Sequence, residues 1–161
     1  MQIRTAALQD LPALTAVEAA CFPPAEAATQ AQLAARLRNY GNHFWLLLDG
    51  ASVVSFVDGF CTDLPDLTDE MYENAALHQE HGAWQMIFGV NTLPAYRRQG
   101  CAERLLRRAI EDARVQGRRG LVLTCKDHLV PYYAKFGFQN EGVTSNSTHG
   151  GVVWNQMRLT F

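Results

Sequence analysis

Arg97-Arg98-Gln99-Gly100-Cys101-Ala102 separates a strand-like apolar stretch, residues 84–92, from a long amphipathic segment, residues 100–116. The apolar residues of that segment recur at intervals of three and four, which predicts a helix with one buried face. A turn of small residues before a helix leaves backbone N–H groups unpaired at the positive end of the helix dipole. Such a turn binds phosphate, and neighbouring arginines add fixed positive charge. The stretch therefore predicts a site for the phosphates of a nucleotide-bearing ligand.

The pattern of this turn is Arg-x-x-Gly-x-Ala, and the sequence lacks the glycine patterns typical of nucleoside triphosphate and dinucleotide loops. It resembles the pyrophosphate loop with which the GNAT superfamily of N-acetyltransferases holds acetyl-coenzyme A. Residues 124–138 resemble a second signature of that superfamily, a strand followed by a short helix that carries a tyrosine and ends in Phe-Gly-Phe. Residues 22–29 resemble a segment of the arylalkylamine N-acetyltransferase branch and its microbial relatives.

The alternation of expected strands and helices favours an α/β or α+β fold, and a chain of 161 residues suits one domain, residues 1–161. The resemblance implies the mixed, twisted central sheet of the superfamily. That sheet has about seven strands flanked by helices and is splayed open between its fourth and fifth strands. A glycine inside the expected strand 84–92, Gly89, indicates a bulge or a close backbone approach.

The resemblance also implies roles for individual residues. Tyr133 matches the family tyrosine near the coenzyme sulfur, where a phenol assists the departing thiolate. The pantetheine arm would lie along the end of the strand, and the pyrophosphate would lie in the turn. The implied cofactor-binding residues are Val90, Asn91, Thr92, Arg97, Arg98, Gln99, Gly100, Cys101, Ala102 and Glu103.

One part of the expected machinery is missing. The vertebrate arylalkylamine enzymes carry two histidines on the strand as a proton relay, and the matching positions here are Met86 and Phe88. Neither side chain accepts a proton, so the general base is left open. A water chain to one of four acids is an alternative, namely Asp69, Glu70, Glu73 or Glu80. Phe22, Met86 and Phe88 suit an apolar or aromatic substrate body.

Charge is distributed unevenly although the net charge is only −2. Eight of the fourteen lysines and arginines lie between Arg97 and Arg119, and none lies in residues 39–96. That second stretch holds eight of the sixteen acids: Asp49, Asp58, Asp63, Asp66, Asp69, Glu70, Glu73 and Glu80. A basic mouth for coenzyme A and an acidic mouth for a cationic amine are therefore expected. The overall charge does not favour nucleic acid as a partner.

Other features point to a cytoplasmic protein without a metal or a membrane segment. No apolar run approaches about 18 residues, and no signal peptide is apparent. The four cysteines form no Cys-x-x-Cys pair, which favours reduced core residues. His78 and His81 have helical spacing, but no third ligand lies close in sequence, so no metal site is expected.

These observations predict an enzyme that transfers an acetyl group from acetyl-CoA to a primary amine by direct attack on the thioester. The acceptor is expected to be a small cationic amine, arylalkylamine-like or polyamine-like. Two alternatives stay open, namely a non-catalytic coenzyme-A-binding sensor and an acetyltransferase for protein or peptide amines. A homodimer also stays open.

Overall fold

The computed structural model describes all residues 1–161 and arranges its strands in two sheets. The first is antiparallel, in the order β1 (Gln2–Thr5), β2 (Phe44–Asp49), β3 (Ser52–Asp58) and β6 (Gly89–Thr92). The second has the order β4 (Cys61–Thr62), β5 (Trp84–Ile87), β7 (Gly120–Cys125), β9 (Asn155–Thr160) and β8 (Gln139–Val143). Only β5 and β7 pair in parallel. The expected mixed α/β fold is thereby confirmed.

The two sheets part in the middle of residues 84–92, which the sequence predicts as one strand. β5 pairs with β7, whereas β6 pairs with β3 on the other side. The chain changes partners at Phe88, whose N–H donates to the Asp58 carbonyl at 2.8 Å. A Cβ at Gly89 would lie 2.7 Å from Asp58 Oδ1, so this close approach requires glycine. The edge of β6 that faces β7 is therefore left unpaired by either sheet.

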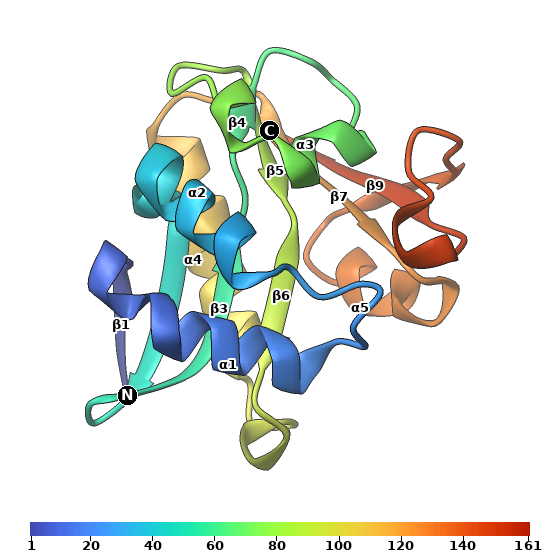
Figure 1. Cartoon of the computed structure of the whole chain (residues 1–161). Helices are drawn as coiled ribbons and strands as arrows, with labels where there is room; N and C mark the ends of the chain where they lie inside the picture. The colour runs from blue at the N-terminus through green and yellow to red at the C-terminus, as the bar shows by residue number, and fades with distance from the viewer.

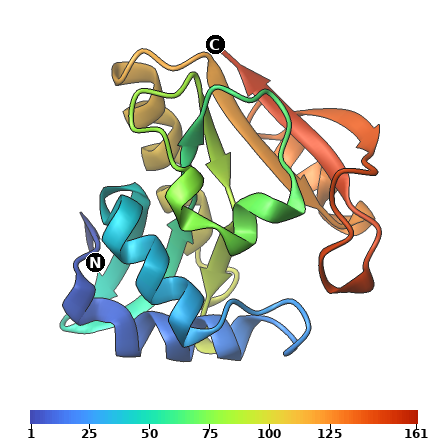
Figure 2. The ribbon, with the colours of Figure 1, turned by 45° about the horizontal axis from the view of Figure 1, so that its top comes forward.

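Helices cover both faces of the first sheet. Figures 1 and 2 show α1 (Leu11–Cys21) and α2 (Gln30–Tyr40) on one side and α4 (Cys101–Val115) on the other. Alternate residues of β2 face the two layers, because Phe44 and Leu46 pack with α1 and α2 while Trp45 and Leu47 pack with α4. Two short helices, α3 (Asp69–Glu73) and α5 (Val130–Ala134), lie beside the second sheet. Six 3₁₀ turns complete the chain, at Leu8–Asp10, Gly41–His43, Ala75–Leu77, Pro94–Tyr96, Asp127–Leu129 and His149–Gly151.

A cap decides where α2 begins. The sequence predicts a helix from Glu26, but Thr29 is extended and its hydroxyl accepts a hydrogen bond from Gln32 N–H at 3.2 Å. The Gln32 side-chain oxygen in turn accepts a hydrogen bond from Thr29 N–H at 2.8 Å, which completes a capping box. The connection of residues 22–28 therefore stays outside the helix. It extends towards α5 (Figure 1) and contributes to the site described below.

None of the helices has the length and apolar character needed to cross a membrane. All four cysteines are free thiols, and three of them are buried.

Candidate active site

The turn before α4 has the geometry of an anion site. Gly100 precedes the helix with φ at +78°, and Arg98 takes a φ of +61° in the same turn. The first backbone bond of α4 runs from Arg104 N–H to the Gly100 carbonyl, at 3.1 Å. The preceding N–H groups have no backbone acceptor, and they point out of the helix start beside two exposed arginines. The turn thus brings unpaired backbone N–H donors and two positive charges together at the start of α4, as an anion site requires.

A groove of about 790 Å³ runs over this turn. It is bounded by the end of β6 on one side and by α5 on the other. Most of the residues that the sequence assigns to the cofactor line it, namely Val90, Thr92, Arg97, Arg98, Gly100, Cys101, Ala102 and Glu103, and so does the predicted catalytic residue Tyr133. The structure thus brings the strand end, the phosphate turn and the tyrosine helix to one groove.

Two of the predicted cofactor residues lie away from the groove. Asn91 is fully buried, and its side chain lies within hydrogen-bond reach of the Phe56 carbonyl on β3. Alternation along β6 explains this position, because Val90 and Thr92 face the groove and the residue between them does not. Gln99 folds back to donate to the Ala95 carbonyl at 3.2 Å. Neither side chain is therefore placed to contact the cofactor.

A second, smaller cavity of about 230 Å³ adjoins the groove. The groove and the cavity share Cys21, Phe22, Val90, Leu129 and Tyr133 as lining residues. The cavity lies in the splay between β6 and β7 and is closed by the connection of residues 22–28 and by residues 149–154. A group bound in one space can therefore meet a group bound in the other beside Tyr133.

Tyr133 lies at this junction and stays protonated at neutral pH. Its side chain is buried, and burial raises the pKa of its phenol above the ordinary value. Its hydroxyl makes no hydrogen bond to another protein group, so its donor is free for a ligand. A neutral phenol with a free O–H is suited to donating a proton to a leaving thiolate.

Glu18 on α1 is a carboxylate that the sequence reasoning missed. It lines the cavity although it is only 4% exposed. Ala28 N–H donates to its Oε2 at 2.9 Å, whereas its Oε1 is buried without a partner. Burial, reinforced by the negative charge of Asp58, raises the pKa of Glu18 to about 7. A carboxylate with this pKa accepts a proton near neutral pH. The available signal was its position four residues after Leu14, on the buried face of α1.

A buried ion pair supports this wall of the cavity. Arg36 Nη1 donates to Asp58 Oδ2 at 3.2 Å, and its other terminal nitrogen donates to the Tyr72 carbonyl at 3.0 Å. The guanidinium lies 5.4 Å from the centre of the Phe88 ring. Burial raises the pKa of Asp58 to about 6, which leaves it largely ionised at pH 7 beside Arg36. The pair fixes Phe88 at the edge of the cavity.

The structure places two of the three expected substrate residues at the cavity and the third in the core. Phe22 and Phe88 line the cavity, as expected for walls around an apolar body. Met86 is fully buried in the core under α1 and α2 and lines neither space. Met86 and Phe88 do share a face, because Phe88 packs against the core cluster that contains Met86, but only Phe88 also reaches the cavity. Ile87, which lies between them on the opposite face, also lines the cavity.

The expected acidic mouth is not made by residues 49–80. None of the eight acids in that stretch lines either space, and most of them accept hydrogen bonds or form ion pairs elsewhere in the fold. Asp69, for example, accepts bonds from Ser147 and Thr148, and Asp66 pairs with Arg158. The negative charge of the cavity comes instead from Glu18 and Glu26. The four acids proposed as proton acceptors, Asp69, Glu70, Glu73 and Glu80, lie outside it.

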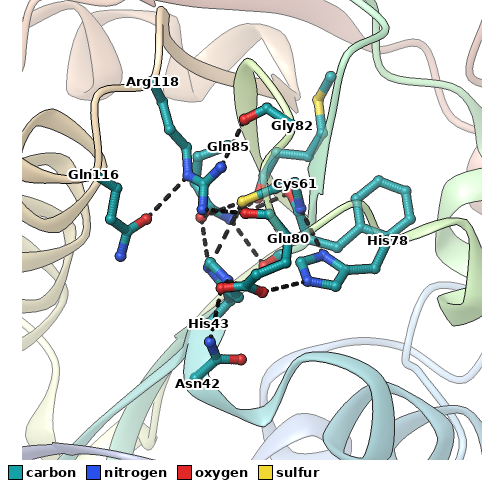
Figure 3. A network of polar contacts seen from close by, with 12 residues as sticks. Asn42, His43, Cys61, His78, Glu80, Gly82, Gln85, Gln116 and Arg118 are labelled. Carbon is teal, nitrogen blue, oxygen red and sulfur yellow. Dashed lines mark hydrogen bonds and ion pairs between the residues drawn. The ribbon is translucent and has the colours of Figure 1, made fainter.

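Three side chains of metal-binding type meet beside the start of β5 (Figure 3). Glu80 Oε2 lies 3.0 Å from His43 Nε2 and 2.7 Å from His78 Nε2. Cys61 N–H donates to His78 Nδ1 at 3.1 Å, and burial lowers the pKa of His78, so the ring is neutral with its proton on Nε2. That nitrogen has no lone pair for a metal ion. We interpret the group as a hydrogen-bond network, and His81 is exposed outside it.

A family model described as an acetyltransferase (GNAT) domain matches residues 10–161. The chain belongs to this family. It is therefore an acyltransferase of the GNAT type, with acetyl-CoA as its co-substrate. The residues of the groove fit such a co-substrate, because phosphates suit the turn and the pantetheine arm suits the unpaired edge of β6.

Several solved structures share the fold across nearly the whole chain. The loading GNATL domain of CurA from Lyngbya majuscula is 16% identical with a TM-score of 0.84, over 99% of this chain and 96% of that one. The GphF GNAT-like decarboxylase, solved with isobutyryl-CoA, is 22% identical with a TM-score of 0.81, over 99% of both chains. The ribosomal-protein-S18-alanine N-acetyltransferase from Escherichia coli is 19% identical with a TM-score of 0.73, over 99% and 92%. At these identities the likeness concerns the fold alone.

Proposed function

We propose that this enzyme acetylates a small primary amine held in the cavity between β6 and β7. One observation carries the proposal. A buried carboxylate with an unpartnered oxygen and a pKa of about 7, Glu18, lines a cavity that opens into the cofactor groove beside Tyr133. Glu18 takes the role of the general base that the sequence leaves open at Met86 and Phe88.

The reaction needs three proton movements, and two groups of the chain, Glu18 and Tyr133, account for them. Acetyl-CoA supplies an activated thioester carbonyl when bound. Glu18 accepts one proton from the ammonium form of the substrate, and the neutral nitrogen then attacks that carbonyl. Tyr133 donates its proton to the sulfur as the carbon–sulfur bond breaks, and the second proton that the nitrogen loses on becoming an amide returns to the Tyr133 oxygen. An alkylammonium has a pKa near 10.4, about 3.4 units above neutral pH, so a nearby base with a pKa of about 7 lowers the cost of forming the neutral amine.

The shape of the cavity favours an acceptor of limited size. Its volume of about 230 Å³ suits one ring or a short chain, and Phe22, Phe88 and Trp154 give it apolar walls. The segment that resembles the arylalkylamine branch, residues 22–29, contributes directly to these walls. We therefore propose an arylalkylamine-type acceptor. Because two GNAT structures with this fold are named as ribosomal-protein alanine acetyltransferases, the terminal amine of a protein is the alternative acceptor.

The proposal is tested by coenzyme A release from acetyl-CoA in the presence of arylalkylamines, diamines, amino sugars and short peptides. Release with the arylalkylamines, reduced at least a hundredfold in Glu18→Gln, supports it. Release only with peptides moves the acceptor to protein amines. No release with any amine, together with tight coenzyme A binding by calorimetry, refutes it in favour of a coenzyme-A sensor. A carboxyacyl-CoA belongs in the panel as well, because one solved structure with this fold is a GNAT-like decarboxylase.

A further inference from the structure

A second buried carboxylate lines the acceptor cavity and has no role in the proposed chemistry. Glu26 lies in the connection between α1 and α2, and its side chain is only 5% exposed. Lys126 Nζ lies 2.8 Å from Glu26 Oε1. Glu26 Oε2 is buried without any hydrogen-bond donor. An unpaired carboxylate oxygen in such a place costs free energy, which a ligand donor would recover.

The surroundings of Glu26 are shaped around it. The side chain of Glu26 packs on Gly150, where an added Cβ would lie 2.6 Å from Glu26 Cγ. Gly150 has a φ of +68°, so a larger residue would also strain the backbone there. His149 Nε2 donates to the Glu26 carbonyl at 2.8 Å, and its ring stacks on Tyr72 with the centroids 4.7 Å apart. Two segments far apart in sequence thus hold this carboxylate at the cavity wall.

The charges around the cavity restrict what Glu26 can bind. Arg36 is paired with Asp58, and Lys126 is paired with Glu26. Glu18 is therefore the one carboxylate in the cavity wall without a cationic partner, and it matches a single ammonium group. A second ammonium on the same ligand would find Glu26 already neutralised by Lys126.

We propose that Glu26 Oε2 is a specificity-determining acceptor for a neutral N–H or O–H donor carried by the substrate amine. The substrate class is then a monoamine with one additional hydroxyl or amide group, and diamines are excluded. This inference rests on the proposed function for the role of Glu18. The role of Glu26 itself is supported by its buried position, by its ion pair with Lys126 and by its unpaired oxygen.

The test is calorimetric titration of matched amines into the protein saturated with coenzyme A, which does not depend on turnover. The hydroxyl pair is tyramine against 4-methoxyphenethylamine. The amide pair is phenylalaninamide against its N,N-dimethylamide. In the wild type, at least one donor-bearing member should bind about tenfold tighter than its methylated partner, since a bond to a carboxylate is among the stronger hydrogen bonds. In Glu26→Gln that ratio should fall to within about twofold.

A second variant, Lys126→Gln, tests whether the ion pair of Glu26 excludes diamines. In the wild type, 1,4-diaminobutane should bind no tighter than butylamine. In Lys126→Gln the Glu26 carboxylate loses its cation, so the preference for the diamine should rise about tenfold. Lys126 is more exposed than Glu26, which makes this variant the safer one for folding.

The outcomes separate the two proposals. Amine-dependent release of coenzyme A with ratios near one for both matched pairs overturns the role of Glu26 and leaves the acetyltransferase proposal standing. Ratios that survive in Glu26→Gln, or a wild type that prefers the diamine, also overturn it. If the ratios behave as expected but no coenzyme A is released, the recognition role holds and the proposed function fails. An absence of amine binding contradicts both.

Discussion

The cofactor groove and the acceptor cavity share Tyr133 but are built in different ways. The groove takes most of its wall from one run of sequence, from Val90 to Glu103, and adds α5. The cavity draws on α1, the connection after it, α2, α3, β5, β6, β7, α5 and residues 149–154. A site made by one turn can be recognised in the sequence, whereas a site made by many segments is formed only when the chain is folded.

The two spaces also carry charge differently. Arg97 and Arg98 are exposed beside the phosphate turn, where solvent and salt reach them. Glu18 and Glu26 are buried in the cavity wall, where burial raises the pKa of Glu18 to about 7. The groove therefore depends on screened surface charge, and the cavity depends on desolvated charge.

Removing the carboxylate of Glu18 should have the largest effect on the cavity. We expect Glu18→Gln to lower turnover of the best amine by about 10²- to 10⁴-fold, the usual contribution of a positioned base. Coenzyme A affinity should change little, because Glu18 does not line the groove. Glu111→Gln, an exposed change on α4, is the matched control. A Glu18→Gln enzyme with wild-type turnover would remove Glu18 from the mechanism.

The same variant should be more stable than the wild type at pH 8. Because folding raises the pKa of Glu18 from 4.5 to about 7, ionising it costs the folded protein stability as pH rises across that range. Glutamine removes that cost, and each kcal/mol recovered raises Tm by about 2–4 °C in a domain of this size. At pH 4 the difference should vanish. Thermal unfolding at both pH values checks this, and equal Tm values at pH 8 would contradict the buried charge.

A change in the groove should act on the cofactor. Gly100→Glu puts a side chain at a φ of +78° and a negative charge in the phosphate turn. We expect the Kd for coenzyme A to rise about tenfold to a hundredfold by calorimetry, from backbone strain and repulsion together. Gly100→Ala shares the strain without the charge and should show the smaller part of the loss. Equal Kd values for the glutamate variant and the wild type would refute the phosphate turn.

The junction between the two spaces should respond to loss of one hydroxyl. Tyr133→Phe keeps the ring that packs against Phe138 and removes the free donor. We expect kcat to fall about tenfold or more while the Kd for coenzyme A stays within about twofold. Parallel losses in kcat and in coenzyme A binding would instead indicate a packing role for Tyr133.

Salt should have the smallest of these effects, and it should weaken coenzyme A binding in the groove more than amine binding in the cavity. Raising salt from about 50 to 500 mM should weaken coenzyme A binding several-fold, because the arginines of the turn are exposed. The KM for the amine should change less than twofold, because the carboxylates of the cavity are buried. An amine KM that rises as steeply as the coenzyme A Kd would place exposed acids at the acceptor mouth.

The same contrast explains what could be predicted from the sequence. The helix after the phosphate turn follows from a local pattern, and the expected place of Tyr133 beside the cofactor follows from the resemblance to the family. The structure contains that helix and places Tyr133 in the wall of the groove. Gly89 predicts an irregularity next to Phe88, but the division of this run between two sheets was not predictable from it, because the division depends on pairing with β3 and β7, which are distant in sequence.

The functional acids were misplaced for a related reason. A stretch rich in acids, residues 49–80, indicated an acidic mouth, but folding pairs Asp66 and Glu80 with distant cations and histidines. The two acids that do line the cavity, Glu18 and Glu26, are each flanked by apolar residues in the sequence. Glu18 had a local signal in its place on the buried face of α1, and Glu26 had none, because its position depends on Gly150 and Lys126.

We expect the buried carboxylate of Glu18, beside the cofactor groove, to remove the proton of the amine. The pH dependence of kcat/KM for the best amine tests it most directly, in the wild type and in Glu18→Gln. We expect kcat/KM to rise through an apparent pKa near 7 in the wild type. In the variant this limb should be lost, leaving only the limb of the amine itself. An inflection near 7 that persists without the Glu18 carboxylate would contradict the account.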